Sequence, residues 1–223
     1  MQFSSSVAIA LESASHHPLE ASPTNVEDIR LIGITMRYGR DQEIFGEGEG
    51  ANHVYKVLCG AVRGFRVLAD GRRQISEFYL PGDVFGFEAG LERRASAEAL
   101  TDTTLVVARR AGLSGESDGE IERSLWRAAV AELRRSRDHV LTLGRRSASE
   151  RVATFLVDLA ERIGEGESVE LPMSRQDIAD YLGLTIETVS RTLTQFQVAG
   201  LIRLANCRDV HILRPQGLEE LCD

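Results

Sequence analysis

The sequence predicts an α+β protein in which an antiparallel β roll is followed by a long helix and a C-terminal winged helix-turn-helix domain. Three observations predict this order: short β-type runs separated by glycine, a long stretch with apolar residues at helical spacing, and two short helical patterns around a glycine. The 223 residues, 43% of them hydrophobic and 27% charged, are enough for two modest cores. We expect a tail over residues 1–28, the roll over 29–115, the long helix over 116–144 and the winged domain over 145–223.

The first segment predicts a tail, because it is rich in Ser, Ala and Glu and shows no sustained period. His16 and His17 have no Cys, Asp or Glu at ligand spacing, so we expect solvated histidines and no metal site. The start lacks the basic residues of a secretory signal, and no segment approaches the roughly 18–20 apolar residues of a membrane helix. A cytoplasmic protein with no membrane partner is expected.

Short strands are predicted between residues 32 and 109. The apolar runs stand at residues 54–58, 61–68, 75–80 and 104–107. Asp70-Gly71 is a strong turn signal between two of them, and Pro81-Gly-Asp83 is another. This spacing indicates an antiparallel roll or barrel.

A helix of about 27 residues is predicted over 117–143, roughly 40 Å at 1.5 Å per residue. It carries apolar or small residues at steps of three and four: Ile121, Leu125, Ala129, Leu133, Ser136, Val140 and Leu143. The helix could pack on its own roll alone, but its length exceeds what one small domain covers. A two-fold coiled coil between two copies is therefore favoured, with a weak seam at Ala129 and Ser136.

A hinge is predicted at Gly144-Arg-Arg146, before the C-terminal domain. Ser147 and Glu150 can cap the next helix. The inward face of that helix is expected to hold Val152, Phe155, Leu156, Leu159 and Ile163.

Residues 173–196 predict a helix, a tight turn and a second helix. Ser174 and Asp177 can form a capping box, Gly183 can take the positive φ of the turn, and Thr185 can cap the second helix. The buried stripes would be Ile178, Ala179 and Leu182 on the first helix and Val189, Leu193 and Phe196 on the second, with Ile186 at the edge. Gly200 ends the second helix, and residues 201–204 and 210–213 predict a β-hairpin, the wing.

The second helix leaves Glu187, Thr188, Ser190, Arg191 and Thr194 facing outward. Glutamate can accept from the amino group of cytosine and arginine can donate twice to guanine, each pair giving about 1–3 kcal/mol of discrimination. The alternative is an i,i+4 ion pair on a solvated helix. The capping residues and the turn glycine favour DNA reading, and we include Ser174, Arg175, Thr185 and Ile186 among the candidate DNA contacts.

The net charge of −8 argues mildly against nucleic acid. Acidic and basic residues nearly balance even over residues 170–214. Affinity would therefore depend on a few placed arginines and on helix N-termini that meet phosphates, and high salt sensitivity is expected.

The segment from Asp180 to Arg191, Asp-Tyr-Leu-Gly-Leu-Thr-Ile-Glu-Thr-Val-Ser-Arg, resembles the recognition segment of the Crp/Fnr superfamily, especially its FixK group. The resemblance runs from about residue 29 to the C-terminus. It implies that Glu187, Ser190 and Arg191 read TTGA-type half-sites in an inverted repeat. Ile186 and Ser190 stand where the catabolite-activator group has arginine and glycine, which argues against that group's operator.

The same resemblance implies a jelly-roll effector domain, a homodimer, and recruitment of RNA polymerase through the roll. It further implies activation of genes for microaerobic or anaerobic respiration or nitrogen fixation, often without a small ligand. The alternative is a regulator that responds to cyclic nucleotide. Members that bind it carry Gly-Glu for the ribose, whereas Gly86 is followed here by Phe87.

Glu88, Arg94 and Ser96 could imitate the nucleotide-binding set at shifted spacing, since an arginine fork suits phosphate. We favour instead a solvated turn at Arg93 and Arg94, or a surface that touches polymerase.

Cysteine usage argues against a cofactor. Cys59, Cys207 and Cys222 are few, widely spaced and odd in number, which fits reduced thiols. The iron–sulfur members of the family hold their cluster with several cysteines before the roll, where this chain has none. Cys207 is expected to be a polar turn residue, with an oxidation-sensitive thiol as the alternative. No nucleophile–base pair or phosphate loop indicates an enzyme.

Overall fold

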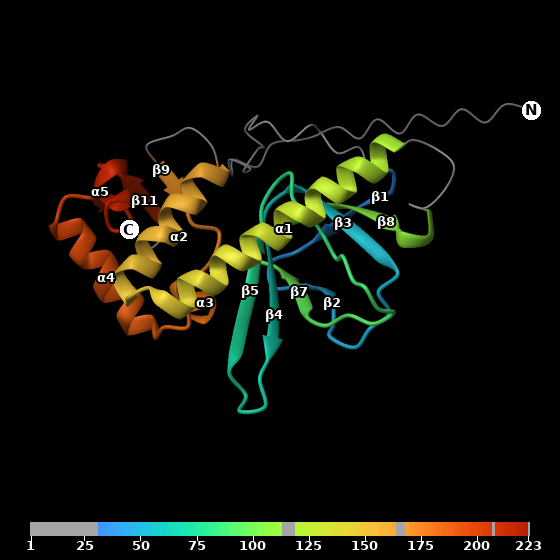
Figure 1. Ribbon diagram of the computed structural model, residues 1–223, viewed down its shortest axis with the longest axis horizontal. Helices are drawn as coiled ribbons and strands as arrows, with labels where there is room; N and C mark the ends of the chain where they lie inside the picture. The colour runs from blue at the N-terminus through green and yellow to red at the C-terminus, as the bar shows by residue number, and fades with distance from the viewer. Residues whose placement is uncertain (1–30, 113–118, 164–167, 207, 223) are drawn as a thin grey trace, which may run out of the picture.

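The computed structural model describes residues 31–112, 119–163, 168–206 and 208–222. A β roll and a helical C-terminal domain lie next to each other, and one long helix runs along the roll and into the second domain (Figure 1). The predicted α+β class is confirmed. Within the described ranges no helix is both long and apolar enough to cross a membrane.

The roll consists of two four-stranded antiparallel sheets. The first has the order β1 (Ile34–Tyr38), β8 (Thr103–Arg109), β3 (His53–Cys59) and β6 (Val84–Phe85). The second has the order β2 (Glu43–Phe45), β7 (Ser96–Ala99), β4 (Val62–Val67) and β5 (Arg73–Tyr79). Aromatic and aliphatic side chains from both sheets fill the space between them, including Phe45, Tyr55, Tyr79, Phe85 and Leu105.

The four predicted strand runs correspond to β3, β4, β5 and β8. Gly71 and Gly82 take φ values of +82° and +96° in the two predicted turns. Strands β1, β2, β6 and β7 were not predicted. Three of them span two to four residues, too few to show an alternating pattern.

The long helix α1 spans Gly119–Arg145, 27 residues. It runs through Gly144 to Arg145, and the break before α2 lies at Arg146 and Ser147, so it overlaps only the last residue of the predicted hinge. Leu125 packs with Ala128 against the apolar cluster around Val54 and Val84 of the roll. Leu125 is therefore partly covered within the subunit.

A second face of α1 is exposed and apolar. It carries Trp126, Val130, Leu133 and Val140. These positions follow steps of four, three and seven, which place them along one helix face. The predicted set contained Leu133 and Val140 but not Trp126 or Val130.

The C-terminal domain contains helices α2 (Ala148–Ile163), α3 (Arg175–Leu182), α4 (Ile186–Val198) and α5 (Pro215–Glu219). Its three-stranded sheet has the order β10 (Ile202–Leu204), β11 (Asp209–Ile212) and β9 (Ser168–Glu170). The predicted hairpin is β10 and β11, whereas β9 and α5 were not predicted. Ser147 and Glu150 form the predicted cap of α2, with backbone N–H groups donating to each other's side chains at 2.9 and 3.4 Å.

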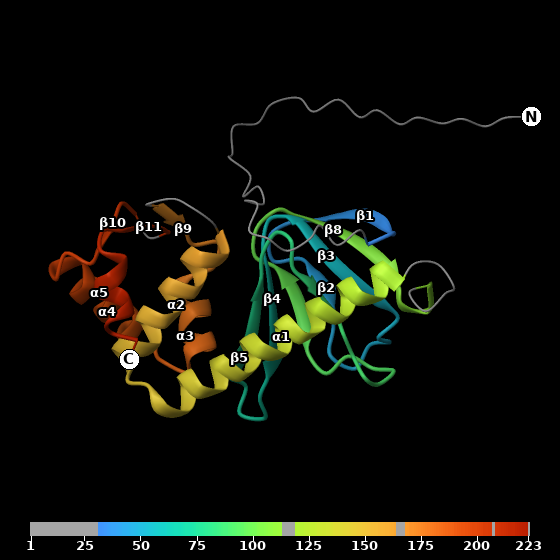
Figure 2. The same ribbon diagram turned by 45° about the horizontal axis from the view of Figure 1, so that its top comes forward.

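The roll and the C-terminal domain share one apolar core. Phe78 of the roll lies 5.0 Å between ring centroids from Tyr181 of α3, and 6.1 Å from Phe155 of α2. The view in Figure 2 shows α2 and α3 next to the end of the roll formed by β4 and β5. The position of the C-terminal domain is therefore tied to the roll by packing as well as by α1.

Candidate DNA-binding site

The first helix of the helix-turn-helix, α3, begins with the predicted capping box. Ser174 Oγ accepts from Asp177 N at 3.1 Å, and Asp177 Oδ2 accepts from Ser174 N at 3.0 Å. Two N–H groups that a helix start leaves unpaired are satisfied in this way. The hydroxyl of Ser174 also donates to Asp177 at 2.6 Å. The proton of this candidate DNA contact is therefore used within the helix cap.

The turn between α3 and α4 is as predicted. Gly183 takes φ +62° and ψ 38°, the left-handed conformation that closes a helix, and its N–H donates to Ala179 O. Thr185 then caps α4, its hydroxyl accepting from Thr188 N at 3.2 Å. Thr185 itself is exposed. Local interactions within a few residues thus define both helices and the angle between them.

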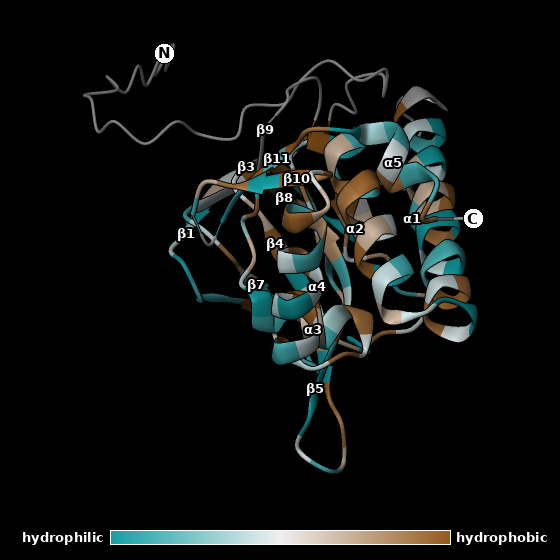
Figure 3. Ribbon diagram, turned by 90° about the vertical axis from the view of Figure 1, so that its left-hand side faces the viewer, coloured by the Kyte–Doolittle hydropathy of each residue, from teal (hydrophilic) through white to brown (hydrophobic). Residues whose placement is uncertain are grey.

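The buried and exposed faces of α4 are also as expected. Val189, Leu193 and Phe196 are buried, and Ile186 is 38% exposed at the edge of this stripe. Glu187, Arg191 and Thr194 are exposed, while Thr188 and Ser190 are partly exposed. Figure 3 views this domain end on, with α3 and α4 in front of the roll. The candidate base-reading side chains therefore lie on the free face of the helix.

Electrostatics favour an ionised Glu187. The backbone N–H of Glu187 and the Thr185 hydroxyl hydrogen-bond the carboxylate and lower its pKa, and Arg191 is the smallest favourable contribution. The helix cap thus lowers the pKa of this carboxylate more than the Arg191 guanidinium does. A fully charged acceptor at neutral pH suits the amino group of a base.

Arg175 differs from the other candidates. Its side chain is half-buried, and its buried Nε has no hydrogen-bond partner among the described residues. The outward face of α4 also includes residues that the sequence reasoning did not select. Gln195 and Val198 line a shallow groove there together with Ser190, Arg191, Thr194 and Ala199.

The wing is a three-stranded sheet, because β9 pairs with β11 alongside β10. Its turn is built by Asn206, whose Oδ1 accepts from Arg208 N at 2.7 Å and Asp209 N at 2.9 Å. Arg203 on β10 is exposed. Cys207 lies outside the described residues, so its predicted role is not addressed by the structure.

The interior of the roll contains an unexpected cation. Arg93 is 2% exposed, so the predicted solvated turn is wrong for this residue, whereas Arg94 is exposed. The Arg93 guanidinium donates to Gly86 O at 2.8 Å and to His53 O at 2.5 Å. The guanidinium can be buried next to aromatic rings because its hydrogen bonds to the two carbonyl oxygens replace hydrogen bonds to water.

Within the shifted nucleotide-binding set, the side chains of Glu88 and Ser96 accept hydrogen bonds from the roll, whereas the Arg94 side chain is exposed. Arg94 N donates to Glu88 Oε1 at 3.1 Å, and Ser96 Oγ accepts from Glu47 N at 3.0 Å. Within the described residues no group of three or more His, Cys, Asp or Glu side chains could hold a metal ion. His16 and His17 lie outside those residues, and Cys59 and Cys222 are free thiols.

Two family models match this chain, one over the roll and one over the C-terminal domain. Residues 35–115 match the model of the cyclic nucleotide-binding domain, and residues 150–221 match that of the Crp-like helix-turn-helix domain. The chain is 46% identical over 201 residues to the nitrogen fixation regulation protein FixK of Rhizobium meliloti (strain 1021), covering 90% of this chain and 92% of that protein. The chain belongs to the Crp/Fnr family of transcription regulators.

Other relatives agree with this membership. The transcriptional activator protein Anr of Pseudomonas protegens is 34% identical over 204 residues, covering 86% of this chain and 83% of that protein. The structure of FixK2 from Bradyrhizobium japonicum superimposes with a TM-score of 0.82 at 45% identity, covering 86% of this chain and 98% of that one. The relatives of this Crp/Fnr protein are regulators and not enzymes.

Proposed function

We propose that this Crp/Fnr protein is a homodimeric activator that reads TTGA-type inverted repeats with Glu187, Ser190 and Arg191. The observation that carries the proposal is the capped helix α4, which presents these three side chains on its free face. Glu187 would accept from a cytosine amino group and Arg191 would donate to guanine O6 and N7. Arg175, Ser174 and the helix N-termini would meet phosphates and set the register.

The homodimer is proposed to form through α1. Its exposed apolar face includes Trp126, Val130, Leu133 and Val140, and it lies beside the Leu125 contact with the roll. Single exposed apolar residues are ordinary, but a row of them along one 27-residue helix is typical of an interface. Two copies related by a two-fold axis would place their α4 helices in successive major grooves, about 34–36 Å apart.

The regulated genes are proposed from the relatives. Proteins named nitrogen fixation regulation protein FixK and transcriptional activator protein Anr support control of nitrogen fixation or of microaerobic and anaerobic respiration. Bound beside a promoter, the dimer would recruit RNA polymerase through surfaces of the roll.

We further propose that no small ligand is needed. Arg93 fills the space between Phe45 and the Gly86 turn inside the roll, and Gly86 is followed by Phe87 where nucleotide-binding members carry glutamate. A regulator that responds to cyclic nucleotide remains the second candidate, since residues 35–115 match that domain's model. Its signature would be heat stabilisation by cAMP or cGMP that grows with ligand concentration.

Fluorescence anisotropy tests the proposal directly. The purified protein is titrated, without ligand, into a TTGA inverted-repeat duplex and a TGTGA one at fixed moderate salt. Tight binding to the TTGA duplex is expected, with Glu187→Ala and Arg191→Ala each weakening it by roughly 5–150-fold for 1–3 kcal/mol. Glu161→Ala, which removes an exposed carboxylate of α2, serves as the matched control. Binding that requires cyclic nucleotide, or that prefers TGTGA, would contradict the proposal.

A further inference from the structure

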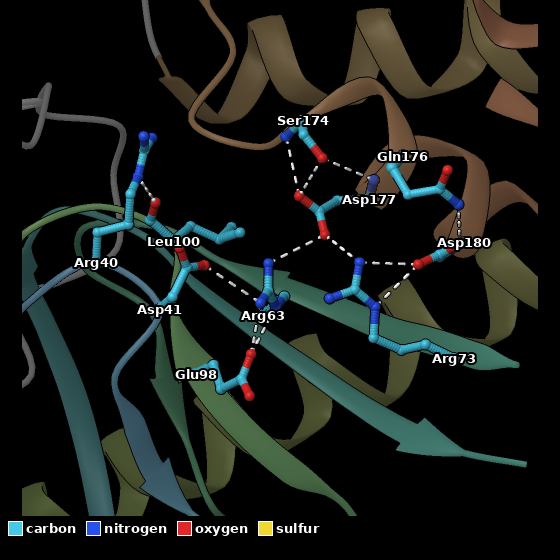
Figure 4. Close-up of polar contacts among 10 residues, drawn as sticks. All are labelled: Arg40, Asp41, Arg63, Arg73, Glu98, Leu100, Ser174, Gln176, Asp177 and Asp180. Atoms are coloured by element: carbon cyan, nitrogen blue, oxygen red, sulfur yellow. Dashed lines mark hydrogen bonds and ion pairs between the residues drawn. The ribbon is translucent and has the colours of Figure 1, made fainter. Parts of the chain in front are cut away.

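The carboxylate of Asp177 connects the start of α3 to the roll (Figure 4). Its Oδ2 closes the capping box with Ser174. Its Oδ1 accepts from Arg63 Nη1 at 3.1 Å and from Arg73 Nη2 at 2.6 Å. Asp177 is 3% exposed, so both oxygens are engaged away from bulk water. One buried side chain therefore links the helix-turn-helix to strands β4 and β5.

Both arginines are themselves held in place by further carboxylates. Arg63 donates twice to Glu98 Oε2, at 2.5 and 3.0 Å, and Arg73 Nε donates to Asp180 Oδ2 at 2.9 Å. A guanidinium is a rigid planar fork, so carboxylates on two of its edges define its direction as well as its position. Arg73 consequently binds two carboxylates of α3, those of Asp177 and Asp180.

The C-terminal end of α3 has its own contact with the roll. Gln74 Nε2, from β5, donates to the carbonyl oxygen of Tyr181 at 3.3 Å. A helix of eight residues, about 12 Å long at 1.5 Å per residue, is thus attached near both ends. Since α4 begins at Ile186, three residues after Gly183, and packs on α3, a rotation of α3 against the roll also turns α4.

Ion pairs act together with the shared apolar core in holding this end of α3 on the roll. A pocket of about 260 Å³ separates the roll from the start of the helix, and it is lined by Arg40, Arg63, Arg73, Ser174, Asp177 and Arg208 among others. Buried ion pairs add little net stability compared with apolar contacts, but removing one partner leaves an unpaired charge. Such pairs therefore penalise orientations of α3 in which a partner is lost.

We infer that Arg63 and Arg73 are positioning residues for DNA binding, which hold α3 and the reading helix α4 at one angle to the roll. The inference rests on the proposed function, because the angle between two α4 helices decides which half-site spacing a dimer accepts. The roll also packs on α1, the proposed dimer helix. We call the ion pairs among Arg63, Arg73, Asp177 and Asp180 the latch. Through the roll and α1, the latch would determine the orientation of each α4 relative to the two-fold axis of the dimer.

The first experiment compares operators that differ in spacing. Binding of Arg73→Met is measured on the inverted repeat that the wild type prefers and on repeats one base pair longer or shorter. Affinity for the preferred operator is expected to fall roughly tenfold, within the range typical of coupling between sites, whereas the other two change less than about twofold. A variant that keeps the wild-type preference and affinity would overturn the inference.

The matched control is Arg66→Met. Arg66 lies on the same strand as Arg63, is exposed, and pairs at 2.7 Å with Glu47 on the surface of the roll. Arg66→Met removes one positive charge, as Arg73→Met does, and should leave the preference for operator spacing unchanged. Arg73→Lys, which retains the charge but not the planar fork, is expected to fall between wild type and Arg73→Met. Equal losses in Arg66→Met and Arg73→Met would show a general charge effect and refute the latch.

A second readout needs no DNA. Spin labels at the exposed residues Glu92 of the roll and Glu219 of α5, in protein diluted with unlabelled copies, report the distance between the two domains. Arg73→Met should broaden the distance distribution and Arg66→Met should not. If Arg73→Met fails to fold, Asp180→Asn weakens one contact and should broaden the distribution less. A wild type that binds no operator refutes the proposed function, whereas unchanged distributions refute the latch.

Discussion

The guanidinium carbon of Arg93 lies 4.1 Å from the centre of the Phe45 ring, inside the β roll. Its two carbonyl partners belong to different segments, Gly86 after β6 and His53 at the start of β3. The cation therefore joins β2, β3 and the Gly86 turn at a point between the two sheets. A desolvated cation over an aromatic face contributes on the order of 2 kcal/mol.

Replacing this cation should destabilise the roll. Arg93→Met leaves both carbonyls without their donor, and we expect the free energy of unfolding to fall by roughly 3 kcal/mol, since each unsatisfied buried group costs about 1–3 kcal/mol. Urea unfolding followed by far-ultraviolet circular dichroism measures the change. Arg94→Met, at the exposed neighbouring position, should alter it by less than about 0.5 kcal/mol. Equal effects of the two variants would contradict the role of Arg93.

Arg93 also marks the limit of prediction from sequence. Two adjacent arginines in a glycine-containing stretch read as a solvated turn, and nothing within a few residues distinguishes them. Burial of Arg93 depends on Phe45 and Tyr55, which the sheets bring close from strands far away in sequence. The short strands β2 and β6 escaped prediction for the same reason, because long-range pairing, not a local pattern, stabilises them.

The helix-turn-helix was predictable because its determinants are local. Ser174 with Asp177, Gly183, and Thr185 with Thr188 each act within three or four residues. The latch was not predictable, although Asp177 was correctly placed in the capping box. Its partners Arg63 and Arg73 stand more than 100 residues earlier, and no period in the sequence connects them with α3.

Glu77 should give the fold a measurable pH dependence. The side chain is 5% exposed, and burial raises its pKa from 4.5 to about 7, although Arg135 and Arg162 oppose the shift. The folded state thus holds a proton that the unfolded chain releases more easily. The contribution to the free energy of unfolding is complete below pH 4.5 and is lost as pH rises to about 7, by up to roughly 3 kcal/mol at about 1.4 kcal/mol per pKa unit.

Glu77→Gln should remove the Glu77 contribution, so that stability rises with pH relative to the wild type, because the amide cannot titrate but retains the shape. Urea unfolding between about pH 4.5 and 7 provides the comparison with the wild type. Glu161→Gln, at an exposed position of α2, is the control. Parallel curves for the wild type and Glu77→Gln would rule out a raised pKa at this position.

His139 should produce the opposite slope. Its ring stacks on Tyr181 with centroids 3.9 Å apart, and burial lowers its pKa from 6.5 to about 4. The unfolded chain then binds the proton more readily, so stability present above pH 6.5 is lost as pH falls toward about 4. His139→Phe keeps a ring against Tyr181 and should make stability fall more steeply with rising pH than in the wild type. An unchanged slope in this variant would contradict the shift.

Gly183 should tolerate alanine better than Gly60 does. A Cβ at Gly183 would meet its nearest atom, Arg151 Nη1, at 3.7 Å, so Gly183→Ala costs mainly the left-handed backbone, about 1–2 kcal/mol. At Gly60, also at positive φ, a Cβ would lie 2.5 Å from Asp102 O, and a larger loss is expected. Thermal unfolding of both variants gives the ranking, and a reversed order would contradict this account.

Leu133 tests the proposed dimer. It is 50% exposed on α1, so Leu133→Glu should leave the subunit folded while placing a charge in the proposed apolar seam. Analytical ultracentrifugation should then show a monomer that no longer binds the inverted repeat tightly. Leu125→Ala, at a position of the same helix that packs on the roll, is the matched comparison. Because Leu125 packs on the roll, this variant should lose stability yet remain dimeric. A dimeric Leu133→Glu would place the subunit contact elsewhere, whereas a monomeric Leu125→Ala would mean that the roll contact and the seam are not independent.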